Sequence, residues 1–117
     1  ILSSAASDVY KRQDMDQRQN EIYKTQCNHG GAMVAFTVKG NEKGAFKFLD
    51  SLNLIKLAVS LGSNESLAQH PYSMTHSDVP DGVKNSIGIT EGLIRLSVGI
   101  EYADDIISDL KQALDKI

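Results

Sequence analysis

The order of apolar runs along the chain constrains the fold more than any other feature of the sequence. Three short runs are rich in aliphatic and β-branched residues, which is typical of strands, and they are residues 32–39, 54–61 and 93–98. Two further segments repeat apolar residues at helical spacing, and they are residues 45–52 and 106–117. This order predicts an α/β domain in which a small sheet carries helices packed on one face.

Four weaker signals complete the prediction of secondary structure. Residues 14–28 are polar and compatible with a helix, although they offer few apolar anchors. Asn41 is a candidate cap for the helix that follows the first strand. Residues 66–70 suggest a short helical piece before a proline, and residues 72–87 form the longest irregular stretch. Loops of that length in a compact domain are usually functional or disordered.

Composition narrows the classes of protein to which the chain can belong. A length of 117 residues suits one domain, and a net charge of -3 gives no reason to expect nucleic acid as a partner. No apolar run approaches the ~18 residues that a membrane span requires, so we expect no membrane partner. Cys27 is the single cysteine, which fits a cytoplasmic location. The histidines and Cys27 lack the spacing of metal ligands, so we expect no metal site.

The first thirteen residues differ from the rest of the chain. Residues 1–13 show no sustained periodicity and no convincing helix cap, so we interpret them as a non-native or disordered N-terminal segment. Residues 14–117 are then expected to form the single domain.

Arg95 is the most informative residue for function. It lies in the middle of a short apolar strand, where a guanidinium is costly to desolvate unless an anion meets it. Its planar fork matches a carboxylate, which predicts a ligand that carries one. From position alone, an internal ion pair with one of the 15 acidic residues is the more frequent explanation.

Two other candidates are weaker on local grounds. Ser60 ends an apolar run before a glycine turn, and such strand ends are where α/β folds place ligands. Thr75 and His76 lie in the irregular stretch, where a solvated loop is the simpler interpretation. No nucleophile motif, phosphate-binding loop or zinc motif is present in the sequence.

Several motifs, in order and at compatible spacing, resemble one enzyme family. They are Ser60-Leu61-Gly62, Glu65-Ser66-Leu67, His70-Pro71, Ser73-Met74-Thr75-His76 and the run from Leu93 to Glu101. Together they are similar to the C-terminal end of the Cys/Met-metabolism family of pyridoxal-phosphate (PLP) enzymes. The resemblance begins near Glu21 and continues into the closing helix.

The resemblance implies a fold and a set of roles. The fold would be the C-terminal domain of the fold type I, aspartate-aminotransferase-like PLP enzymes. Arg95 would clamp the α-carboxylate of an amino-acid substrate, Ser60 would line the substrate pocket, and Thr75 would brace the arginine. The residues that hold PLP in this family precede the matching region, so this chain should supply no cofactor-binding or catalytic residue and should be inactive alone. The parent enzyme is expected to be a homotetramer.

Within the family, the resemblance leans towards the methionine γ-lyases. Val59 precedes Ser60 where cystathionine-handling members often have an acidic residue. The implied parent reaction is α,γ-elimination of L-methionine to methanethiol, 2-oxobutanoate and ammonia. A cystathionine γ-synthase, a cystathionine γ-lyase or an O-acylhomoserine sulfhydrylase is the alternative. From another class, a non-catalytic α/β module that binds small carboxylates through Arg95 also remains open.

Overall fold

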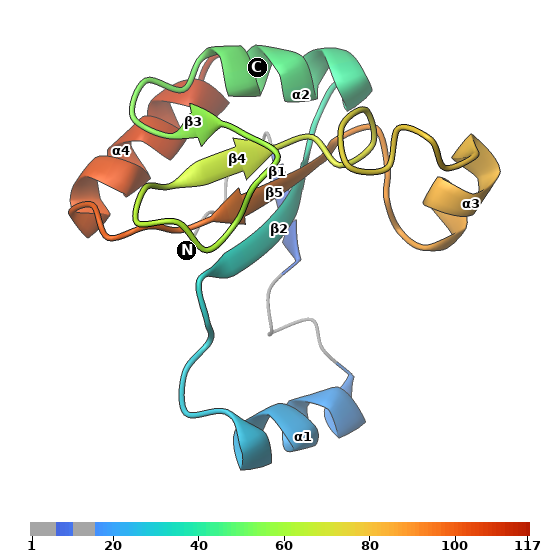
Figure 1. Ribbon diagram of the computed structural model, residues 1–117, viewed down its shortest axis with the longest axis vertical. Coiled ribbons are helices and arrows are strands. Elements are labelled where there is room, and N and C mark those ends of the chain that lie inside the picture. The colour runs from blue at the N-terminus through green and yellow to red at the C-terminus, as the bar shows by residue number, and fades with distance from the viewer. Residues whose placement is uncertain (1–6, 11–15) are drawn as a thin grey trace.

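The computed structural model describes residues 7–10 and 16–117, which form one mixed sheet with helices around it (Figure 1). The strands are β1 Ser7–Tyr10, β2 Met33–Val38, β3 Lys56–Leu57, β4 Leu67–Gln69 and β5 Leu93–Ser97. The helices are α1 Gln17–Gln26, α2 Asn41–Asp50, α3 Asp81–Ser86 and α4 Ala103–Leu114. Among these helices, none is long and apolar enough to cross a bilayer.

The sheet places β5 at its centre. The strand order is β1-β2-β5-β4-β3, and every pair is antiparallel except β3 with β4. In the register, Arg95 lies opposite Ala35 of β2 on one side and opposite Gln69 of β4 on the other. Arg95 therefore lies in the central strand, which is hydrogen-bonded to β2 on one side and to β4 on the other.

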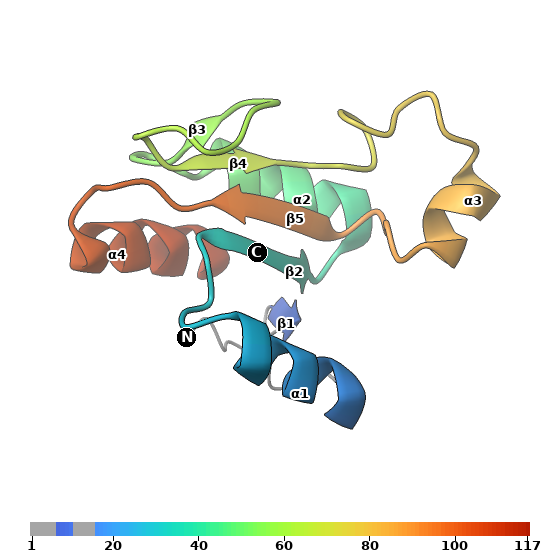
Figure 2. The ribbon, with the colours of Figure 1, turned by 60° about the horizontal axis from the view of Figure 1, so that its bottom comes forward.

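Two helices cover one face of the sheet, as the sequence predicts. Figure 2 shows α2 behind β4 and β5, and the shared core places α4 on the same face, while α1 stands apart from the central strands. Phe36 of β2 meets Phe48 of α2 edge to face, with ring centroids 5.6 Å apart. The same core includes residues of both helices and of β4 and β5, namely Ala45, Leu49, Ala68, Ile94, Leu96, Ile106, Leu110, Ala113 and Leu114. Each buried large apolar side chain contributes about 1.5–3 kcal/mol, so this layer supplies most of the stability of the domain.

The opposite face of the sheet presents the polar residues of the central strands. Successive side chains of a strand point to opposite faces, and Ile94 and Leu96 point towards the helices. Arg95 and Ser97 therefore share the other face, and the register places Gln69 there as well.

Two expectations at the ends of elements were wrong. Residues 66–70 are not helical, because Leu67–Gln69 form β4, which pairs with β5 and with β3. A strand of three residues is too short to display a period, so its pairing partners decide its conformation. Asn41 does not cap α2 with its side chain; Gly40 occupies the cap position at φ 86° and Asn41 itself has φ 52°. This left-handed pair turns the chain sharply from β2 into α2, and glycine tolerates such a turn without a steric penalty.

The remaining expectations differ from the structure mainly in extent. The run at residues 54–61 contributes only the two residues of β3, followed by an extended segment in which Ala58 N–H donates to Ala68 C=O at 3.1 Å. The helix expected at residues 14–28 is confirmed as α1, whose residues are all at least partly exposed. The irregular stretch at residues 72–87 contains α3. Within residues 1–13, the described part is β1, a strand that was not expected from the sequence, and the other positions lie outside the described residues. The domain bounds stay a prediction.

Candidate functional site

Arg95 is held in place by a buried neutral side chain. Gln69 lies directly opposite it on β4 and is 1% exposed. With its amide oxygen turned towards the guanidinium, Gln69 accepts hydrogen bonds from both Nε and Nη2 of Arg95. These two bonds fix the plane of the guanidinium and leave the remaining N–H groups of Arg95 for another partner.

The internal ion pair that competed with a ligand is not what the structure shows. Among residues 7–10 and 16–117, the one ion pair joins Lys84 and Asp81, whose atoms are 3.3 Å apart. Arg95 is only half-buried, and no carboxylate of the described residues pairs with it. The positive charge therefore remains available to a ligand on this face of the sheet.

The Ser60 turn is anchored beside this charge. The backbone N–H of Gly62 donates to Ser97 Oγ at 2.9 Å. Ser97 stands two residues after Arg95 on the same strand, so both side chains lie on the same face. Ser60 itself is exposed. The structure thus brings the turn that carries Ser60 to the face that carries Arg95.

A second set of hydrogen bonds fixes the far end of this turn. Glu101 accepts from the Ser66 backbone N–H at 2.6 Å and from the Ser66 hydroxyl at 2.8 Å, and Ser66 Oγ accepts from Gly99 N–H at 2.9 Å. The bonds from the Ser66 backbone and then from its hydroxyl lower the pKa of Glu101. The carboxylate therefore stays charged at neutral pH and keeps its grip on the turn.

Thr75 forms no hydrogen bond with Arg95 in the described part of the chain. It is exposed, and its hydroxyl interacts with His76 Nδ1 at 2.9 Å. In the described part of the chain, Arg95 is braced by Gln69, and the role of Thr75 as a brace stays a prediction. Gln69 was not recognised from the sequence because its segment was expected to be helical. A strand over Leu67–Gln69 would have placed it on the face of Arg95.

His70 is a second residue to which no role was given from the sequence, where it appeared only in the motif His70-Pro71. Its side chain is 0% exposed. Its Nε2 is 2.6 Å from the Glu91 carbonyl oxygen, and its Nδ1 is 2.7 Å from Ser73 Oγ. Because a carbonyl oxygen only accepts, Nε2 carries the proton, and in the neutral ring Nδ1 accepts from Ser73. His70 therefore ties the start of the Thr75 loop to the residues that lead into β5.

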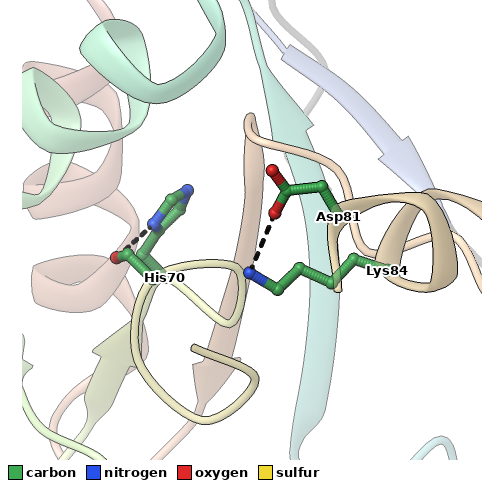
Figure 3. Close-up of polar contacts among 4 residues, drawn as sticks. His70, Asp81 and Lys84 are labelled. Atoms are coloured by element: carbon green, nitrogen blue, oxygen red, sulfur yellow. Dashed lines mark hydrogen bonds and ion pairs between the residues drawn. The ribbon is translucent and has the colours of Figure 1, made fainter. Parts of the chain in front are cut away.

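The loop beyond His70 is held by a compact charged cluster. Figure 3 shows Lys84 of α3 reaching towards Asp81, with His70 on the neighbouring loop. The ammonium of Lys84 also lies 4.2 Å from the centroid of the Tyr72 ring. Burial, followed by the hydrogen bond and the charge of Asp81, raises the pKa of Tyr72. These contacts attach α3 to the loop that carries Tyr72, so we assign Lys84 and Asp81 a structural role.

The described residues do not fit PLP as a group held by this chain alone. Covalent attachment of PLP needs an accessible amine inside a pocket, and Lys84 is the one buried lysine in the described part of the chain. Its ammonium is already committed to Asp81 and to the ring of Tyr72. The same residues contain no group of three or more His, Cys, Asp or Glu side chains that could hold a metal ion.

Comparison with known proteins identifies the family. A family model described as Cys/Met metabolism PLP-dependent enzyme matches residues 4–115. The L-methionine γ-lyase of Treponema denticola is 52% identical over 99 residues, which is 85% of this chain and 25% of that protein. The cystathionine γ-lyase of Dictyostelium discoideum is 48% identical over 98 residues, which is 84% of this chain and 25% of that protein.

A solved structure agrees with the sequence matches. The crystal structure of cystathionine γ-lyase from Lactobacillus plantarum, complexed with L-serine, superposes with a TM-score of 0.85 at 38% identity. The superposition covers 98% of this chain and 30% of the Lactobacillus plantarum chain. The chain spans about a quarter of the length of the curated relatives that it matches. Its fold is that of the C-terminal domain of the fold type I PLP enzymes, and the chain belongs to the Cys/Met-metabolism family of PLP-dependent enzymes.

Proposed function

We propose that this chain is the substrate-binding C-terminal part of a methionine γ-lyase-like enzyme. The parent would convert L-methionine to methanethiol, 2-oxobutanoate and ammonia by α,γ-elimination. One observation carries the proposal: Arg95 is half-buried on the sheet face opposite the helices, held by a neutral partner and unpaired with any described carboxylate. The substrate α-carboxylate is the anion that this arrangement lacks.

The role of Arg95 would be to orient the substrate. A guanidinium binds a carboxylate through two parallel hydrogen bonds, which fix the rotation of the amino acid as well as its position. PLP, bound by other parts of the parent, supplies the electron sink for the reaction. Fixing which bond at Cα faces that cofactor is worth several kcal/mol in positioning.

The surroundings of Ser60 favour methionine over cystathionine. Val59 and Leu61 flank Ser60 in the turn and are 59% and 54% exposed. A thioether side chain gains by lying against such apolar groups. The distal ammonium and carboxylate of cystathionine need polar partners, which these two side chains do not offer.

A cystathionine lyase or an acylhomoserine sulfhydrylase is the second candidate. The similarity to the cystathionine γ-lyase of Dictyostelium discoideum is nearly as high as the similarity to the methionine γ-lyase of Treponema denticola. The full-length protein assayed with L-methionine, with L-cystathionine and with O-acetylhomoserine plus sulfide separates these reactions. A kcat/KM that is highest for cystathionine or for O-acetylhomoserine would overturn the methionine assignment.

The role of Arg95 is tested by substitution in the same full-length protein. Arg95→Ala removes a charged partner of the substrate, which costs about 3 kcal/mol and lowers kcat/KM roughly 100-fold. Arg95→Lys keeps the positive charge but loses the two parallel hydrogen bonds, so its kcat/KM should lie between the values of the wild type and of Arg95→Ala. Unchanged kinetics in both variants would refute the clamp.

The chain on its own distinguishes the enzyme part from a free-standing binder. We expect it to be inactive and to bind L-methionine too weakly to be detected by calorimetry, because the rest of the pocket is supplied elsewhere. Binding by the isolated chain that disappears in Arg95→Ala would instead support a small-carboxylate-binding module.

A further inference from the structure

We infer that Gln69 is a positioning residue that orients Arg95 for the substrate carboxylate without neutralising its charge. The inference rests on the proposed function of Arg95 and names the residue on which that function depends. Gln69 is fully enclosed, lies opposite Arg95 in the β4–β5 register, and accepts from Nε and Nη2 of the guanidinium.

The neutrality of the partner is the informative property. A guanidinium has five N–H donors, and the bonds to Gln69 engage two of them. A carboxylate at the same position would accept the same bonds, but it would also cancel much of the positive charge of Arg95. An amide keeps the geometry and leaves the full charge of Arg95 for an incoming anion.

The other neighbours of Arg95 do not compete for this charge. The residue opposite it on β2 is Ala35, whose side chain has no acceptor. The hydroxyl of Ser97, on the same face of β5, is engaged with the backbone N–H of Gly62. The arginine is therefore aligned from one side by an uncharged acceptor and is open on the face that carries the Ser60 turn.

Gln69 is itself held on both sides. On its N-terminal side, Gln69 continues the strand β4, which pairs with β5. On its C-terminal side, it is followed by His70, whose ring contacts Ser73 and the Glu91 carbonyl. A side chain placed this firmly can transmit its own position to the guanidinium. A loosely held glutamine at the surface could not.

The test compares two inhibitors that differ only in the carboxylate. L-norleucine is an isostere of methionine that lacks the leaving group, and pentylamine is the same molecule without its carboxylate. Inhibition constants for both are measured in the full-length protein for the wild type and for Gln69→Met, Gln69→Glu and Arg95→Ala. Gln26→Glu adds the same charge on an exposed position of α1 and serves as the control.

The expected pattern is selective for the carboxylate. Gln69→Met should raise the inhibition constant of norleucine about tenfold, because the guanidinium loses its alignment. Gln69→Glu should raise the inhibition constant of norleucine roughly 100-fold while the melting temperature is maintained. The new ion pair would hold Arg95 in place but neutralise its charge. Pentylamine should be unaffected in both variants, and Gln26→Glu should change neither constant.

The outcomes separate the inference from the function on which it rests. If Arg95→Ala leaves norleucine inhibition unchanged, the proposed clamp is wrong. If Arg95→Ala weakens norleucine but both Gln69 variants leave it unchanged, the clamp stands and the role of Gln69 is overturned. An equal loss of norleucine and pentylamine in the Gln69 variants also overturns it, because that pattern indicates a general structural defect. Should Gln69→Met fail to fold, Gln69→Asn, which withdraws the amide by one methylene, carries the same comparison.

Discussion

Asp109 of α4 offers the sharpest test of how the domain is held together. It is 5% exposed and accepts three backbone N–H groups from the segment after α2: Asn53 at 2.8 Å, Leu54 at 2.9 Å and Ile55 at 2.9 Å. The side-chain amide of Gln112 adds a fourth bond at 3.0 Å. One carboxylate thus joins the last helix to the segment that leads into β3.

The cost of Asp109→Ala follows from which donors lose their only acceptor. The N–H of Ile55 belongs to a buried residue, so leaving it unpaired costs about 2 kcal/mol. Leu54 is half-buried and adds about 1 kcal/mol, while Asn53 is exposed and its N–H finds water. We expect the free energy of unfolding to fall by about 3 kcal/mol.

Urea denaturation measures this difference. Asp105→Ala is the matched control, since it removes the same charged group from an exposed position one turn earlier on α4. Asp105 lies in the first turn of α4, where a carboxylate interacts with the helix dipole, so its loss should change the free energy of unfolding by no more than about 1 kcal/mol. If Asp109→Ala fell within the same range as the control, the three backbone bonds would not carry the stability assigned to them.

The same carboxylate makes stability depend on pH. Burial alone would raise the pKa of Asp109, but the N–H groups of Ile55, Asn53 and Leu54 together outweigh it and lower the pKa below the ordinary value. The unfolded chain therefore binds a proton at a higher pH than the folded chain does. The contribution of Asp109 is fully present above about pH 4 and is lost as the pH falls through the folded pKa. The gap in stability between wild type and Asp109→Ala should narrow on acidification, and a gap that widened would contradict this sign.

Two further predictions concern single positions. Gly44→Ala should lower the free energy of unfolding by about 1–3 kcal/mol despite the better helix propensity of alanine, because a Cβ at Gly44 would overlap the carbonyl oxygen of Lys39. In Gly82→Ala of α3, nothing lies within 4 Å of the added Cβ, so the free energy of unfolding should instead rise by about 0.5–1 kcal/mol. Thermal melts of both variants measure these changes. A stabilising Gly44→Ala would show that α2 does not approach the backbone of Lys39 so closely. The ring of His70 should be protonated at Nε2, as its bond to the Glu91 carbonyl requires, and long-range ¹H–¹⁵N spectra would refute this by showing the Nδ1 tautomer.

Periodicity predicted the elements that are long enough to display it. The stripe of α4 and the apolar strands β2 and β5 are evident in the sequence, because each repeats its pattern over five or more residues. Arg95 was recognisable for the same reason, as a charge that interrupts such a pattern. These features together gave the layered α/β fold and the centre of the candidate site.

The partners of Arg95 could not be predicted in this way. Gln69 matters because of its register with β5, and register is decided by pairing between segments that are 26 residues apart. His70 is buried because a loop and the entry to β5 close over it, which no local pattern signals. The resemblance to a family implies that Ser60 and Thr75 lie near a substrate, and both roles stay predictions.

The two-ended attachment of the Ser60 turn has a consequence for how such a domain can diversify. The bonds that hold the turn join Gly62 and Ser66 on the turn to Ser97 at the end of β5 and to Gly99 and Glu101 beyond it. The side chains of residues 59–61 stand outside this scaffold, so they can be exchanged without moving the backbone that presents them. Under the proposed function, preference for one sulfur amino acid over another would change through a few substitutions in residues 59–61, while Arg95 and Gln69 would keep the common head group in the same place.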